Sequence, residues 1–245
     1  MPVTSPKRTR DADASRARIF AAAAEEFAAH GFDGAKVDRI AERASVNKAM
    51  LYYHYADKSA LYTAVVGDMF ASIAVQMRAL RAAGGPPDIQ LRAFVDVIAR
   101  EGRARPHFPG MWLRELADGG AHLDATTFEH IVTIVSTLGE IVRTGAAAGQ
   151  FAPMPPFLVQ MGIVGPLFLF LATRPMRQRV KACLPQPQTE VDDDVFVDYV
   201  KRMTLGALAA PPASRKQASK PRSHTRGTSV RTRVRGKVRS KAGTR

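Results

Sequence analysis

Apolar side chains near the start of the chain recur with the period of an α-helix, and the sequence has no alternating run long enough to predict a strand. Ile19, Ala23 and Phe27 share one helical face, and Gly31 follows where a helix would end. The pattern predicts a first helix over residues 12–30. A second helix, over residues 36–44, has apolar side chains at i, i+3, i+4 and i+7, namely Val37, Ile40, Ala41 and Ala44.

A third, short helix is predicted to begin after Asn47, whose side chain can accept hydrogen bonds from the first turn. We expect Asp57 and Lys58 to mark its end. Its predicted inward-facing residues are Leu51, Tyr52 and Tyr55. The three residues from Ser45 to Asn47 separate it from the second helix, which is the spacing of a helix-turn-helix. In that motif the second helix of the pair lies in the major groove of DNA.

The rest of the chain is also predicted to be helical. An apolar stripe runs from Leu61 to Gly84 without a helix-breaking residue, which predicts a long connecting helix. Further helices are predicted at residues 89–100, 109–118, 125–148, 156–173 and 192–208. The fold class is therefore all-α, with a flexible arm (1–11), a helix-turn-helix domain (12–60), a helical effector-binding and dimerisation domain (61–210) and a disordered tail (211–245).

The basic charge of the chain is concentrated at one end. The formal net charge is +14, and residues 211–245 hold 12 basic side chains and no acidic one. This tail has few apolar residues to bury, so we expect it to be disordered. It can act as a non-specific nucleic-acid arm or as a solubilising extension. Lys7, Arg8 and Arg10 offer a second basic arm, which can enter the minor groove or be a disordered leader.

Several other classes of protein are disfavoured. The most apolar stretch, residues 157–173, is shorter than a membrane span and contains Pro166, so no membrane partner is expected. The single cysteine, Cys183, cannot form an intramolecular disulfide and fits a reducing cytoplasm. The sequence shows no phosphate-binding loop, no metal-ligand cluster and no nucleophile with a nearby base. We therefore expect a protein that is not an enzyme and that uses no metal or cofactor.

Residues 19–61 resemble the DNA-binding region of the TetR family of transcriptional regulators. The resemblance rests on Ile19-Phe20-Ala21-Ala22-Ala23, Phe27, Gly31-Phe32-Asp33, the run from Val37 to Ala44, and Leu51-Tyr52-Tyr53-His54-Tyr55 with Lys58 and Leu61. Two positions depart from the family pattern. Ser45 stands where the family usually has glycine, so a left-handed backbone there costs on the order of 1 kcal/mol. Ala35 and Lys36 stand where a threonine often caps the second helix, so that hydroxyl cap is missing.

The third helix carries the candidate DNA-reading residues. We expect Asn47, Lys48, Ala49, Met50 and Tyr53 to face the bases, because Lys48 can donate to guanine and short apolar groups can meet a thymine methyl. Tyr52 and Lys58 match family positions that hold the phosphate backbone. The alternative for Tyr52 is a core aromatic residue with its hydroxyl at the surface.

The resemblance implies that the later helices form an effector pocket and a two-fold dimer interface. Candidate interface residues are Phe157, Leu158, Met161, Val164, Leu167, Phe168, Leu171, Val195, Tyr199, Met203 and Leu208, with intramolecular core as the alternative. Candidate pocket residues are Met69, Phe70, Met77, Phe94, Phe108, Met111 and Trp112, and ordinary core packing explains them equally well. Arg114 and Glu115 can be polar anchors of that pocket or a solvated pair on a helix.

The sequence thus predicts a DNA-binding regulator in the cytoplasm, at the nucleoid. Repression is the usual mode of the family, so we expect a homodimer that binds palindromic double-stranded DNA and is released by a small apolar effector. The alternative is an architectural protein that coats DNA through its basic tail.

Overall fold

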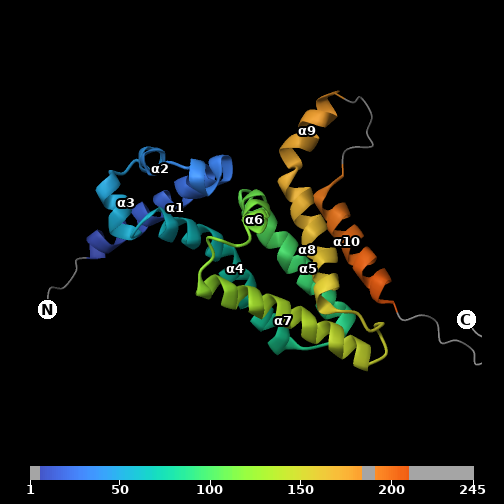
Figure 1. Ribbon diagram of the computed structural model, residues 1–245. Helices are drawn as coiled ribbons and strands as arrows, with labels where there is room; N and C mark the ends of the chain where they lie inside the picture. The colour runs from blue at the N-terminus through green and yellow to red at the C-terminus, as the bar shows by residue number, and fades with distance from the viewer. Residues whose placement is uncertain (1–5, 184–190, 210–245) are drawn as a thin grey trace, which may run out of the picture. The chain divides into compact units, whose positions relative to one another are not determined.

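The computed structural model describes residues 6–183 and 191–209, and the regular elements in these ranges are α-helices joined by short loops, as the sequence predicts (Figure 1). The helices are α1 (Pro6–Gly34), α2 (Val37–Arg43), α3 (Lys48–His54), α4 (Lys58–Ala83), α5 (Pro87–Ala104), α6 (Phe108–Ala117), α7 (Ala125–Ala147), α8 (Pro156–Ala172), α9 (Arg174–Cys183) and α10 (Asp193–Leu208). Within the described ranges, β-type pairing is limited to an isolated bridge between Phe151 and Ala209. The predicted tail at residues 211–245 lies outside the described residues, as do residues 1–5.

The first helix begins earlier than the sequence pattern predicts. α1 starts at Pro6, so residues 6–11, predicted to be a flexible arm, are helical. Proline favours the first position of a helix because its φ is fixed near the helical value, and no helix-breaking residue follows for several turns. Gly31 interrupts the helix as predicted, with φ 70° and ψ −178°.

Two further boundaries correct the prediction. Asp57 does not end the third helix, because α3 already stops at His54. The Asp57 carboxylate instead accepts a hydrogen bond of 2.7 Å from the backbone N–H of Ala60 and caps α4, which therefore begins at Lys58. The sequence prediction also missed α9 (Arg174–Cys183), in which basic residues outnumber the two large apolar ones, Met176 and Val180, and no residue is buried.

α4 is the central helix of the described core. It packs mainly against α7 and α5, and its Leu61, Met69 and Met77 side chains are fully buried. By length and apolar composition α4 could cross a membrane, and α8 passes the same test only together with α9, from which it is bent by 57°. The burial of α4 inside the protein explains its apolar composition, because a core helix is as apolar as a membrane span.

α8 and α10 lie side by side (Figure 1). Both helices have exposed apolar side chains. On α8, Leu158, Met161 and Leu169 are about half exposed, and on α10 so are Val195 and Tyr199. Other members of the predicted interface set are buried within the chain, namely Leu167, Phe168 and Leu208. The outward-facing residues are three, four or eight positions apart, spacings that place them on one side of a helix, so each helix has an inner face in the core and an outer apolar stripe.

A buried polar cluster joins α4 to α6. The hydroxyl of Tyr62 donates a hydrogen bond of 2.9 Å to Glu115, whose side chain is fully buried. The backbone N–H of His122 donates to the same carboxyl group at 2.8 Å, and His122 Nδ1 lies 3.2 Å from it. Burial raises the pKa of the Tyr62 phenol well above its usual value, and the bond to Glu115 raises it further, so Tyr62 stays neutral and keeps its proton to donate.

Replacing Tyr62 by phenylalanine is expected to lower the free energy of unfolding by about 1–3 kcal/mol, because a buried carboxyl group loses a hydrogen-bond donor that no water replaces. Denaturant unfolding followed by circular dichroism measures this change. Tyr53→Phe is the matched control, since the Tyr53 side chain is 77% exposed and its hydroxyl can hydrogen-bond to water. Equal stability of the two variants would show that the cluster contributes nothing to the fold.

Candidate DNA-binding surface

The turn between α2 and α3 has the backbone that the sequence predicts. Ser45 has φ 53°, in the left-handed region that its family position implies. The turn is closed by backbone hydrogen bonds of 3.0 Å from Ser45 to Glu42 and from Val46 to Ala41. Serine therefore adopts the conformation usually given to glycine, with the neighbouring bonds holding it there.

The start of α2 is stabilised by a residue that the sequence pattern missed. Lys36 precedes α2 and provides no side-chain cap, as predicted. The carboxyl group of Glu26, which is 1% exposed, accepts a hydrogen bond of 3.2 Å from the backbone N–H of Lys36. The same carboxyl oxygen lies 3.3 Å from His30 and 3.8 Å from Arg39. A glutamate on α1 thus replaces the missing hydroxyl cap, and no local sequence signal reveals it.

The recognition-helix residues lie on the exposed side of α3. Asn47 accepts a hydrogen bond of 2.7 Å from the backbone N–H of Met50, which confirms its predicted capping role. Tyr53 is 77% exposed, and Lys48, Ala49 and Met50 are exposed beside it. Leu51 and Tyr55 face the core as predicted. The inward orientation predicted for Tyr52 is wrong, because this side chain is 45% exposed and lies on the outer face of a helix of only two turns.

Lys48 is paired with an acidic neighbour on α2. Its ammonium lies 2.8 Å from the carboxylate of Asp38, and both side chains are exposed. The hydrogen bond to Asp38, together with the charge of the carboxylate, raises the pKa of Lys48 above its usual value. Lys48 is therefore charged, and DNA must draw it away from Asp38 before it can donate to a base.

We expect Asp38→Asn to increase affinity for DNA about three- to tenfold, because it removes the competing carboxylate and a negative charge that repels phosphates. Fluorescence anisotropy with a labelled duplex measures the change. Asp88→Asn is the matched control, since it removes an acidic residue from the first turn of α5. An unchanged or lower affinity for Asp38→Asn would show that the pair positions Lys48 productively.

Lys58 is already engaged within the protein. Its ammonium donates a hydrogen bond of 3.2 Å to the backbone carbonyl of Asp33 and lies 4.8 Å above the centre of the Phe32 ring. These contacts tie the start of α4 to the end of α1. A phosphate contact by Lys58, as the resemblance implies, would add to this packing or replace it.

The predicted pocket residues are packed against one another. Met69, Phe70, Met77, Phe94, Phe108 and Met111 are buried, and Trp112 is partly buried against them. The rings of Phe70 and Phe108 meet edge to face at 5.3 Å, and Trp112 lies 4.8 Å from Phe70. The structure brings the predicted set together in one cluster on α4, α5 and α6. The solvated pair considered for Arg114 and Glu115 is ruled out, because Glu115 is buried and bonded to Tyr62.

Comparison with known proteins places the helix-turn-helix in an established family. Residues 19–65 match the family model described as "Bacterial regulatory proteins, tetR family". The repressor SCO4008 of Streptomyces coelicolor is 43% identical over 68 residues, which are 28% of this chain and 35% of that protein. The repressor NicS of Pseudomonas putida is 28% identical over 146 residues, covering 59% of this chain and 69% of NicS. The chain thus aligns with about a third of the first relative and about two thirds of the second.

A solved structure shares the fold over most of the described helices. The regulator FadR of Bacillus subtilis, crystallised with stearoyl-CoA, superposes with a TM-score of 0.62 and 15% sequence identity, covering 79% of this chain and 99% of FadR. At this identity the likeness shows the fold alone. The matched family model and relatives are described as bacterial regulatory proteins and helix-turn-helix transcriptional repressors. The match over residues 19–65 identifies this helix-turn-helix as a DNA-binding unit of the kind found in the TetR family of bacterial regulatory proteins.

Proposed function

We propose that the protein is a repressor that binds a palindromic operator as a homodimer and is released from it by a small effector. The observation that carries the proposal is the exposed face of α3, where the side chains of Lys48, Met50 and Tyr53 are accessible to the major groove once Lys48 leaves Asp38. α3 spans two turns, a length suited to reading a few base pairs at each half-site. Two relatives, SCO4008 and NicS, are named repressors, which supports repression over activation.

The outer apolar stripes of α8 and α10 support a homodimer. Three large side chains on these stripes are more than half exposed in the single chain, namely Leu158, Leu169 and Tyr199. Exposing such apolar surface to water does not stabilise a monomer, and it is typical of an interaction surface. A second copy, related by a two-fold axis, would cover the same stripes on both subunits. Cβ atoms added at Gly162 and Gly165 of α8 would meet no atom within 4 Å, so a partner helix can approach closely there. The two recognition helices would then read a two-fold symmetric site.

The aromatic and methionine cluster supports an apolar effector. Phe70, Phe108 and Trp112 form an adaptable group of rings between α4 and α6, and α4 continues from the helix-turn-helix into the core. FadR, which shares the fold, was crystallised with an acyl-CoA. An effector that separates these rings would displace α4 and change the spacing of the recognition helices. As a bacterial regulator, the protein would act in the cytoplasm at the nucleoid.

Selection of binding sites from random duplex DNA at about 150 mM salt tests the proposal, because non-specific electrostatic binding is weakened there. We expect a palindromic motif to be enriched, and sedimentation to give a dimer at micromolar concentration. A chain ending at residue 210 should keep the same motif with lower affinity. Failure to enrich any motif, with binding lost on deletion of residues 211–245, would favour the architectural protein that acts through its basic tail.

A further inference from the structure

An open cavity of about 340 Å³ lies where α1 of the DNA-binding unit meets α5, α6, α8 and α9. Three arginines line it, Arg103 from α5, Arg114 from α6 and Arg174 from α9, with His107 beside them. Among the described residues that line the cavity, none is acidic. The remaining lining is small or apolar and includes Ala28, Pro106, Gly110, Leu171 and Pro175. A site of this composition favours a ligand with a negative charge and a short apolar part.

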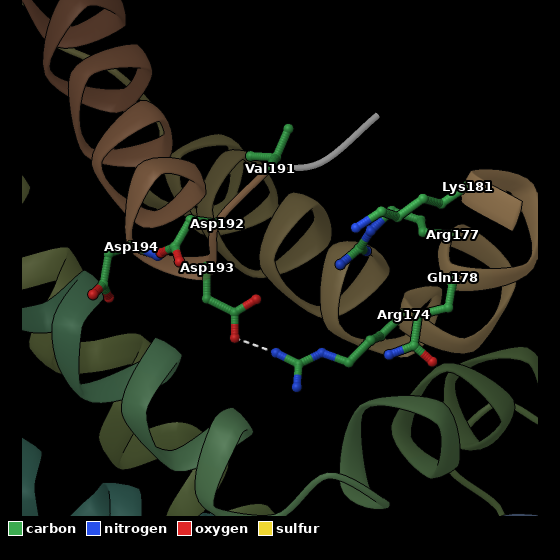
Figure 2. A pocket seen from close by; sticks show the side chains of 8 residues that line it. All are labelled: Arg174, Arg177, Gln178, Lys181, Val191, Asp192, Asp193 and Asp194. Atoms are coloured by element: carbon green, nitrogen blue, oxygen red, sulfur yellow. Dashed lines mark hydrogen bonds and ion pairs between the residues drawn. The ribbon is translucent and has the colours of Figure 1, made fainter. Parts of the chain in front are cut away.

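Two of the three guanidinium groups are held in place by acidic residues outside the cavity. Arg103 donates a hydrogen bond of 2.7 Å to Asp194, and Arg174 pairs with Asp193, both at the start of α10. Figure 2 shows the guanidinium group of Arg174 directed at Asp193. These pairs partly neutralise the two arginines and fix their positions at the cavity wall.

Arg114 differs from its two neighbours because it binds a neutral group. Its Nη1 donates a hydrogen bond of 2.6 Å to the backbone carbonyl of Ala28. Ala28 lies three residues before the break at Gly31, so its carbonyl belongs to the last turn of this part of α1, where carbonyls lack helical partners. Arg114 therefore caps α1 from α6 and links the DNA-binding unit to the regulatory helices.

We propose that this cavity binds the effector through a carboxylate or phosphate group, and that Arg114 leaves Ala28 to hold that anion. This inference rests on the proposed release of a repressor by an effector. A carboxylate or phosphate carries the opposite charge and can accept two parallel hydrogen bonds from a guanidinium, whereas the neutral Ala28 carbonyl accepts a single bond from Arg114, so the anion outcompetes Ala28. α1, which packs against both α2 and α3, then loses this hydrogen bond to α6 and shifts the recognition helix.

The cavity adjoins the aromatic cluster, so one ligand can use both. A Cβ atom at Gly102 would lie 2.7 Å from the Leu171 side chain and 3.6 Å from Phe168. Phe168 in turn meets Phe108 edge to face at 5.8 Å. The anionic group is thus held at the α1 end, while the apolar group points toward the rings. At about 340 Å³ the cavity is near the lower limit of small-molecule sites, which favours a short apolar group.

Calorimetric titration of the full chain with octyl phosphate and with octanoate tests the proposal, and the tighter of the two identifies the anion. Octanol and inorganic phosphate are the controls, each lacking one half of the proposed ligand. We expect at least one of the amphipathic anions to bind about tenfold or more tightly than either control, and to lower operator affinity by a similar factor. Equal binding of octanol would overturn the proposal.

Two variants test separately whether ligand binding needs the charge of Arg114 and the open space at Gly110. Arg114→Gln should weaken binding of the anion about tenfold or more, whereas Arg78→Gln, an exposed arginine of α4 outside the cavity, should leave it unchanged. Gly110→Leu should fill the cavity and block the anion while keeping operator binding, because a Cβ atom at Gly110 meets nothing within 4 Å. Gly110→Ala is its control and should bind both the anion and the operator as tightly as the original chain.

The outcomes also separate this inference from the proposed function. If a palindromic operator is found and the anions bind Arg114→Gln as tightly as the original chain, the cavity is not the effector site and the repressor proposal stands. If the anions bind through Arg114 but no operator is enriched, the cavity is a ligand site and the proposed repressor function fails. The bound anion could then no longer be called an effector.

Discussion

Replacing Leu169 by glutamate is expected to convert the proposed dimer to a monomer and to weaken binding to the proposed operator about 100-fold or more. Leu169 is 57% exposed on the outer stripe of α8, so the substitution disturbs little within one chain. In a two-fold interface it would bury two uncompensated carboxylates, which costs several kcal/mol. Sedimentation equilibrium measures the association, and anisotropy with the selected operator measures the binding.

Leu116→Glu is the matched control for this experiment. Leu116 is 54% exposed on α6, away from the stripes of α8 and α10, so the same change in charge should leave both dimer and operator binding intact. Circular dichroism should show that both variants are folded. A Leu169→Glu chain that remains dimeric and binds its operator normally would mean that the subunits associate through another surface.

Replacing Lys48 by alanine is expected to have the second large effect, about a tenfold loss of operator affinity at each half-site and therefore about 100-fold for the dimer. Lys48 is exposed near the N-terminus of α3, and its ammonium is the charged donor of the predicted base-reading set. The ammonium of Lys48 is already protonated at neutral pH, so no protonation step accompanies binding, although the ion pair with Asp38 must open. Anisotropy at constant salt, with the operator and with random DNA, measures the loss.

The comparison between the two DNAs shows whether Lys48 reads sequence. A base contact should be lost chiefly on the operator, whereas a phosphate contact should weaken both DNAs equally and reduce the salt dependence. Arg78→Ala removes an equal charge from α4 and should affect both DNAs only slightly. Equal losses for Lys48→Ala on operator and random DNA would assign Lys48 to the phosphate backbone.

Together, these substitutions test separate parts of one proposed mechanism. Leu169 tests the pairing of subunits, Lys48 tests the reading of DNA, and Arg114 tests the connection between effector and α1. Because the three residues lie on different helices and share no partner, their effects on stability should be close to additive. A loss of operator binding can then be assigned to assembly, recognition or regulation.

The sequence by itself determined the helices and the turn of the DNA-binding unit. The apolar spacing of α2 and the capping role of Asn47 depend on residues within a few positions of one another, whereas the left-handed backbone of Ser45 was implied by the resemblance to the TetR family. Such short-range patterns can be read directly, because helical side chains three or four positions apart share a face. Where apolar residues at helical spacing are few, the prediction failed. It missed the charged helix α9 and the first turns of α1.

Only the tertiary structure decided which polar groups are buried, paired or free. Tyr62 donates a hydrogen bond to Glu115, which is 53 residues further along the chain. Arg114 donates one to the carbonyl of Ala28, 86 residues earlier. Glu26 on α1 accepts a hydrogen bond from the backbone at the start of α2. No periodicity encodes these contacts, since they arise when helices distant in sequence pack together and buried polar groups must find partners. The same packing made Tyr52 an exposed residue and created the arginine-lined cavity. Helix positions are thus a property of local sequence, whereas the sites between helices depend on how the whole chain packs.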